Sequence, residues 1–174
     1  EPVETDLGEY IIQLRGEKPS HIIAPAVHVT KDQVEEDFRR IHTHLPEERN
    51  LTEGPELVDE ARTILRQRYL DADVGITGAN FCIAETGATV IVTNEGNGDL
   101  TQSLPPVHIV VASIEKIVPT MEDCASILRV LARSATGQEM SSYTTFSNGV
   151  KRDGDLDGPE EFHVIMLDNG RSSM

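Results

Sequence analysis

The stretch PVHIVVAS, at residues 106–113, decides the fold class of this chain. It is so apolar that it is expected to form a strand buried on both faces, as in a parallel sheet covered by helices. Strands are also predicted at 72–77 and at 88–93, where β-branched residues are frequent. Two further strands, at 141–146 and 162–167, are predicted to close the chain.

Three helices are expected around these strands. The sequence TKDQ at residues 30–33 has the form of a capping box and predicts a helix over about residues 31–44. Gly-Pro at 54–55 opens a second helix, whose apolar residues recur at the 3.6-residue period. A third helix is predicted to begin after TMED at 120–123 and to end near Gly137. Helices mixed with apolar strands predict an α/β fold with a mostly parallel sheet flanked by helices.

Length, charge and cysteine content narrow the class of protein. The 174 residues predict a single domain over residues 1–174. The net charge of −15, without a basic patch, argues against nucleic acid and anionic lipid as partners. No apolar run approaches the ~18 residues of a membrane span, so no membrane insertion is expected. Cys82 and Cys124 lie far apart, which indicates neither a disulfide framework nor a thiolate metal site and fits a reducing cytoplasm.

Residues 75–98, GITGANFCIAETGATVIVTNEGNG, form the candidate site. Glycines at strand ends let backbone amides approach a ligand, and in open α/β sheets ligands bind beyond the carboxyl ends of the strands. Glu85 and Glu95 are the candidates for a catalytic base or nucleophile. The alternative is that the stretch only makes tight turns. The residues expected to contact a small carboxylate or phosphate are Thr77, Gly78, Asn80, Thr86, Gly87, Asn94, Gly96 and Asn97.

Other patterns are rejected as sites. His42 and His44 are two apart on a predicted helix and point away from each other, so no metal is expected there. The acidic segment at 153–158 begins like a calcium loop, but Val164 stands where the loop needs a glutamate, so a solvated turn is predicted. The histidines in or beside strands are interpreted as hydrogen-bonded structural residues. No phosphate-binding loop, dinucleotide fingerprint or nucleophile elbow occurs in the sequence.

Several long segments, in a fixed order, carry a resemblance to a known family. They are ETDLGEYIIQLRGEKPSHIIAPAVH at 4–28, ADVGITGANFCIAETGATVIVTNEGNG at 72–98, IEKIVPT at 114–120, RSATGQ at 133–138 and DGPEEFHVIMLDNGRS at 157–172. Together they resemble the LUD domain of the LutB-type lactate utilisation iron–sulfur proteins. The resemblance spans nearly the whole chain, so it is far more specific than any one segment.

That resemblance implies a fold similar to the NagB/RpiA/CoA-transferase group and a role in oxidising L-lactate to pyruvate beside other subunits of a lactate utilisation complex. It also implies [4Fe–4S] clusters in a ferredoxin-like region of the full-length protein. Each cluster needs four thiolates and this chain has two cysteines, so no cofactor is expected in it. The chain is therefore expected to be a LUD domain truncated at both ends relative to the family, and inactive alone.

Two alternatives remain open at this stage. The first is a stand-alone enzyme of the CoA-transferase or sugar-phosphate isomerase kind, in which Glu85 or Glu95 acts directly on a small molecule. The second is a non-catalytic scaffold or docking domain, in which the glycine-rich stretch serves only as turns. Activity of the isolated chain would distinguish the first from the second.

Overall fold

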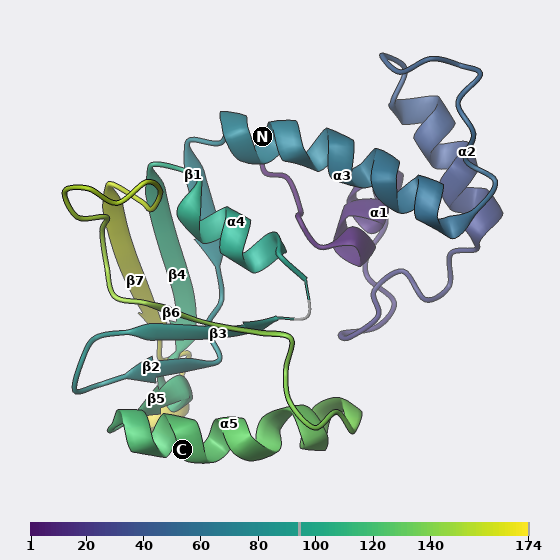
Figure 1. Cartoon of the computed structure of the whole chain (residues 1–174). Coiled ribbons are helices and arrows are strands. Elements are labelled where there is room, and N and C mark those ends of the chain that lie inside the picture. The colour runs from purple at the N-terminus through teal and green to yellow at the C-terminus, as the bar shows by residue number, and fades with distance from the viewer. Residues whose placement is uncertain (94, 174) are drawn as a thin grey trace. The chain divides into compact units, whose positions relative to one another are not determined.

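The computed structural model describes residues 1–93 and 95–173, and the chain divides into two compact units (Figure 1). The helical unit comprises Glu1–Arg68 and the sheet unit comprises Tyr69–Met174. The expectation of one domain over residues 1–174 stays a prediction.

The helical unit contains α1 (Leu7–Arg15), α2 (Lys31–Ile41) and most of α3 (Gly54–Asp71). Helix α1 was not predicted; it begins after Asp6, whose carboxylate accepts a hydrogen bond from the Gly8 amide at 2.9 Å. The capping box predicted for α2 is present, with the Thr30 hydroxyl accepting from the amide of Gln33. Helix α2 ends at Ile41, three residues before its predicted end at 44, because the chain turns there and buries the next side chain.

That buried side chain, His42, joins all three helices of the helical unit. Its Nε2 atom lies 2.8 Å from the Tyr10 hydroxyl in α1, and its Nδ1 atom lies 2.8 Å from a carboxylate oxygen of Glu60 in α3. Its ring also packs against Phe38 in α2, with ring centroids 4.7 Å apart. His42 is therefore a hydrogen-bonded core residue. The prediction that His42 and His44 lie on a helix is wrong, because α2 ends at Ile41.

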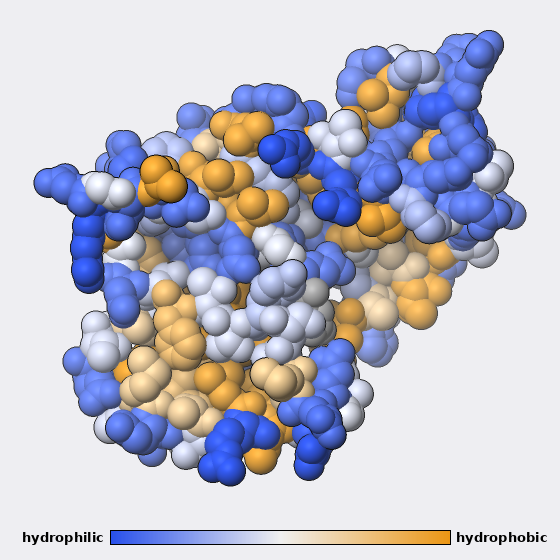
Figure 2. Space-filling model, viewed as in Figure 1, coloured by the Kyte–Doolittle hydropathy of each residue, from blue (hydrophilic) through white to orange (hydrophobic). Residues whose placement is uncertain are grey.

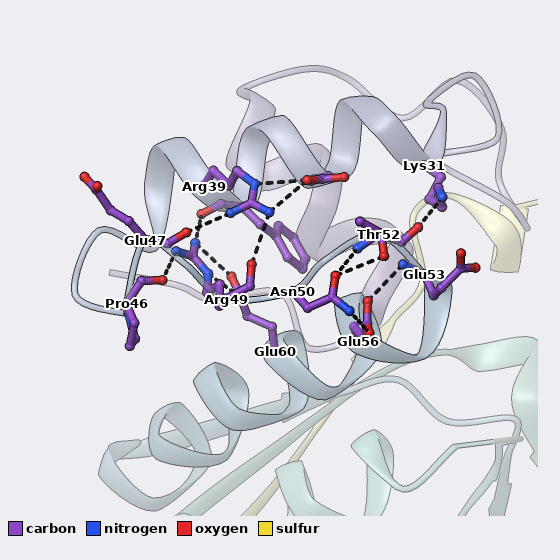
Figure 3. Close-up of polar contacts among 12 residues, drawn as sticks. Lys31, Arg39, Pro46, Glu47, Arg49, Asn50, Thr52, Glu53, Glu56 and Glu60 are labelled. Carbon is purple, nitrogen blue, oxygen red and sulfur yellow. Dashed lines mark hydrogen bonds and ion pairs between the residues drawn. The ribbon is translucent and has the colours of Figure 1, made fainter.

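Two arginines hold the loop between α2 and α3 in place (Figure 3). Arg49 donates to Glu60 at 2.6 Å and to the Phe38 carbonyl at 3.0 Å, so one guanidinium links α2 to α3. Burial raises the pKa of Glu60, but hydrogen bonds from Arg49 and His42 outweigh it and leave that pKa below its usual value. Arg39 binds Glu35 one turn earlier and also donates to carbonyls of the loop. Removing one partner of such a buried pair leaves the other charge uncompensated.

The sheet unit contains two sheets, whose strands run across each other in the view of Figure 1. The first sheet is wholly parallel, in the order β1-β4-β7. The second has the order β5-β2-β3-β6, with one parallel pairing, β2 to β5, and two antiparallel ones. The α/β prediction is thus confirmed. The bounds are β1 (Val74–Thr77), β2 (Phe81–Ile83), β3 (Thr89–Thr93), α4 (Asn97–Ser103), β4 (Val107–Ser113), β5 (Ile117–Val118), α5 (Met121–Thr136), β6 (Tyr143–Ser147) and β7 (Glu161–Leu167).

The apolar stretch at 106–113 forms β4, the central strand of the parallel sheet. The prediction that both of its faces are buried is wrong. Burial alternates along the strand: His108, Val110 and Ala112 are buried, whereas the residues between them are half-buried. Helix α4 covers the buried face, because Gly75, which pairs with His108 in the register, lies directly against the Thr101 carbonyl of α4.

The core of the sheet unit lies between the second sheet and α5. Side chains of β2, β3 and β5 form this cluster together with Cys124 and partly buried leucines of α5; its fully buried members include Ile83 and Val90. Figure 2 shows hydrophobic residues gathered in the part of the surface formed by this sheet and helix. The capping box at Thr120 and Asp123 fixes the start of α5, as predicted, and Gly137 ends it with a φ of 75°.

We expect Ile83→Ala to lower the free energy of unfolding by about 2–5 kcal/mol, because it leaves a cavity in this core. Urea denaturation followed by circular dichroism would measure the change. Val150→Ala, at an exposed position, is the matched control and should stay within about 0.5 kcal/mol of the parent. Equal losses for both variants would contradict the assignment of this core.

The helical unit contains an acid with an unusual proton affinity. The Oε2 atom of Glu9, in α1, is buried without a hydrogen-bond partner among the described residues. A hydrogen bond with the Asp6 carboxyl, reinforced by burial, raises the pKa of Glu9 to about 7. The folded chain therefore holds this proton more tightly than the unfolded chain does. Its contribution to stability is present at low pH and is lost as the pH rises toward 7.

Glu9→Gln, which is neutral at every pH, should raise Tm at pH 8 and leave it nearly unchanged at pH 4. Thermal unfolding at the two pH values would measure this difference. Glu139→Gln, at an exposed position, serves as the control and should behave alike at both. A Glu9→Gln variant that is stabilised equally at pH 4 and pH 8 would show that Glu9 does not titrate in this way.

Candidate functional site

The predicted site residues fall into two groups, at opposite ends of β3. The turn between β2 and β3 carries Glu85, Thr86 and Gly87. The other end of β3 leads into α4, with Glu95, Gly96 and Asn97. Strand β3 has five residues, and at ~3.4 Å per residue its ends are roughly 15 Å apart. Glu85 and Glu95 therefore cannot act on the same reacting atom.

Near the α4 end, the residues that follow β1 support the junction of the two sheets. The Asn80 side chain accepts a hydrogen bond from the Val92 amide at 2.8 Å, and its backbone amide donates to Val90 at 2.8 Å. Gly98 lies so close to Thr93 that an added Cβ would meet its methyl group at 3.0 Å. Gly78 is exposed, and Asn94 lies outside the described residues. The hydrogen bonds of Asn80 fix the turn between β1 and β2, and the close contact of Gly98 with Thr93 fixes the start of α4 against β3.

Thr77, at the carboxyl end of β1, is bound to a histidine of the neighbouring strand. Its hydroxyl lies 2.8 Å from Nε2 of His108, which is buried on the face covered by α4. Burial lowers the pKa of His108 to about 4, so the ring is neutral at physiological pH. The ring also packs against Phe162 of β7, with centroids 5.3 Å apart. His108 is thus a structural residue, as interpreted from the sequence.

In the other group, Glu85 binds the start of a helix. One of its carboxylate oxygens accepts the Met121 amide of α5 at 2.7 Å. An acceptor with negative charge is favourable there, because the first amides of a helix lack partners and the helix dipole is positive. Thr86 accepts the Ala88 amide at 3.2 Å, and Gly87 has a φ of 74°, which favours glycine. The polar atoms of this turn hold the hairpin against α5.

A cleft of about 380 Å³ lies beside the predicted stretch, between α4, β6 and the loop at 148–159. Asp99 and Gln102 of α4 face strand β6 across its floor. Asp99 accepts from the Thr145 hydroxyl at 2.5 Å, and Gln102 accepts from the Ser147 hydroxyl at 2.5 Å. These two hydrogen bonds fix the polar side chains that α4 and β6 contribute to the lining.

The charges of the cleft favour some ligands over others. Three lining carboxylates, Asp99, Asp155 and Asp157, face one ammonium, that of Lys151. Lys151 is itself paired with Glu160 at 3.1 Å. Such a surface repels a free carboxylate or phosphate and suits hydroxyl or amide groups that can donate to its oxygens. The cleft differs in this from the anion site predicted for residues 75–98.

Sequence reasoning missed this cleft, although its first residue, Asp99, directly follows the quoted stretch. The acidic segment at 153–158 was interpreted as a solvated turn, and the structure places three of its residues, Asp155, Asp157 and Gly158, in the wall of the cleft. Strand β6 pairs with β3, and this pairing places β6 and the loop that follows it beside α4. The contact between Thr145 and Asp99 joins residues more than 40 positions apart in the sequence. A one-dimensional pattern carries no signal for it.

The chain's possible metal ligands are dispersed. Among the described residues, no group of three or more His, Cys, Asp or Glu side chains is placed to hold a metal ion. Cys124 is buried in the hydrophobic core, and burial raises the pKa values of both cysteine thiols. In the described part of the chain, no helix has the length and apolar character needed to cross a bilayer.

These features define an α/β protein with a parallel sheet, a mixed sheet and a polar cleft between α4 and β6. The chain belongs to the LUD domain family, whose model matches residues 1–167. The resemblance stated from the sequence segments is thereby confirmed.

Similar proteins are known from several bacteria. Lactate utilization protein B of Anoxybacillus flavithermus and that of Bacillus subtilis are each 49% identical to this chain, over 176 and 179 residues, and match 100% of it. The chain spans 36% of the length of these relatives. A solved structure, a DUF162 family protein from Deinococcus radiodurans, matches 57% of this chain and 56% of its own, with 24% identity and a TM-score of 0.42.

The bond between Glu85 and α5 leads to a stability prediction. We expect Glu85→Ala to lower the free energy of unfolding by about 1 kcal/mol, because the Met121 amide loses its acceptor. Glu85→Gln keeps a carbonyl oxygen at the same place and should cost less. Urea denaturation of the two variants would rank them. Equal stability of Glu85→Ala and the parent would show that the bond contributes nothing.

Proposed function

We propose that this chain is the LUD domain of a subunit like lactate utilization protein B, and that the subunit takes part in oxidising L-lactate to pyruvate. The observation that carries the proposal is the family match over residues 1–167 together with 49% identity to relatives of that name along the whole chain. Because the chain spans 36% of these relatives, the activity belongs to the complete subunit and its complex.

The reaction requires an electron acceptor. Conversion of L-lactate to pyruvate releases two electrons and two protons, and we propose that [4Fe–4S] clusters outside residues 1–174 carry the electrons onward. Each cluster needs four thiolates, and this chain has Cys82 and Cys124 alone. Cys124 lies in the hydrophobic core, so the two residues do not fit a cluster.

Within such a subunit, we assign this domain a binding or docking role toward the other subunits or a small ligand. Two observations support this role over direct group transfer. Glu85, the candidate nucleophile, is engaged by the first amide of α5. The cleft beside α4 is net acidic, so a lactate carboxylate would require a cation from elsewhere. Direct catalysis by Glu85 or Glu95 remains the alternative.

Deletion of the gene in the source organism should abolish growth on L-lactate as sole carbon source, and the complete wild-type gene should restore it. Growth on glucose is the control for general fitness. Full growth of the deletion strain on L-lactate, with no second gene of the same kind present, would refute the proposal.

Glu85→Gln in the complete gene separates the two roles of that residue. A capping residue tolerates the change, because the amide oxygen still accepts from α5, so we expect this variant to restore growth on L-lactate. Loss of growth by a variant that accumulates normally and keeps the parent's stability would favour the group-transfer alternative.

A further inference from the structure

The parallel sheet has one face that its own unit leaves open. Gly75, His108 and Phe162 are register partners, and Gly75 lies against α4, so this set of positions forms the covered face. Side chains alternate along a strand, so the residues between them point to the opposite side. We call this side the outer face. Its apolar residues are Val74, Ile76, Val107, Ile109, Val111, Ile165 and Leu167.

Of these residues, the three in the central strand are half-buried and those in the two edge strands are exposed. Ile76 is 63% exposed, Ile165 47% and Leu167 45%. On the covered face of the same sheet, Val110 and His108 of the central strand are buried, and the residues of the edge strand β7, Val164 and Met166, are less exposed than Ile76, at 39% and 36%. Parallel sheets are ordinarily covered on both faces, because an apolar strand gains stability only when both sets of side chains leave water. The outer face therefore has the composition of a buried layer.

Polar residues border this apolar face. Ser113 ends β4 on the outer side, and Glu161 begins β7 on the same side as Val107, its register partner. Glu161 is paired there with His163, at 3.1 Å. An apolar centre with a polar border is the pattern of a surface that another element covers.

We propose that the outer face is the docking site for an amphipathic helix of the same polypeptide, from a part outside residues 1–174. This inference rests on the proposed function, in which the chain is one domain of a longer subunit. The chain spans 36% of its relatives, so a relative has ample further sequence from which such a helix can come. A helix is the element that covers parallel sheets, and its apolar stripe matches the width of three strands better than a loop does.

Thiol labelling tests the proposal directly. Ile76→Cys places a small reactive group at the most exposed apolar position of the outer face. Its rate of alkylation, read at that peptide by mass spectrometry, is compared between the 174-residue chain and the complete subunit. We expect labelling in the complete subunit to be at least about tenfold slower, because a docked helix removes the thiol from solvent.

The matched control is Leu156→Cys, at a fully exposed position of the loop at 148–159, which should be labelled at the same rate in both proteins. A photo-reactive residue at position 165 of the complete subunit then identifies the occupant. A cross-link to a helical peptide of the same polypeptide, outside the region of this chain, supports the proposal.

Three results would overturn it. Equal labelling of Ile76→Cys in the two proteins would mean that the face stays open. Protection in the 174-residue chain that increases with protein concentration would identify a second copy as the occupant. Protection of the complete subunit that requires an added partner protein would identify that partner instead. Labelling does not depend on lactate oxidation, so a failure of the proposed function would be seen separately, in the growth experiment.

Discussion

The close approach of α4 to β1 at Gly75 is the constraint on which the sheet unit depends. A Cβ at this position would lie 1.9 Å from the Thr101 carbonyl oxygen, so no other residue fits without moving the helix. At that distance, α4 covers His108 and Val110 of the central strand. The same helix presents Asp99 and Gln102 to β6, which connects the parallel sheet to the mixed one. One glycine thus sets the position of the cleft as well as the buried face of the sheet.

The packing of α4 also explains why the two faces of β4 differ. A seven-residue helix is long enough to cover one side of β1 and β4. The longer helix α5 packs on β2 and β5 of the other sheet and buries the cluster around Ile83. On the face that α4 covers, the residues of the central strand are therefore buried inside the unit, whereas Ile76 and Ile165 of the other face are left substantially exposed to water.

Much of the fold followed from local chemistry. The capping boxes at Thr30 and Thr120 located two helix starts, and runs of apolar β-branched residues located five strands to within two residues. Short elements such as β2, β5 and α4 were missed, because three to seven residues give too little periodicity and their form depends on tertiary contacts. The apolar sequence of β4 predicted burial of both faces, and the half-burial of one face was not foreseen, because it depends on which elements pack against the sheet. The cleft was missed because β6 and α4 meet only in three dimensions.

The reactive side chains of the chain are mostly bound to its own framework. Glu85 accepts from α5, His108 is neutral and bonded to Thr77, and Cys124 packs in the core. A group that is held in this way stabilises the fold but is less available for bond-making, since its lone pair or proton is already engaged. Removal of two electrons from lactate needs a carrier that these residues do not provide. Under the proposed function, this domain therefore contributes shape and a surface for docking, and electron transfer depends on the rest of the subunit.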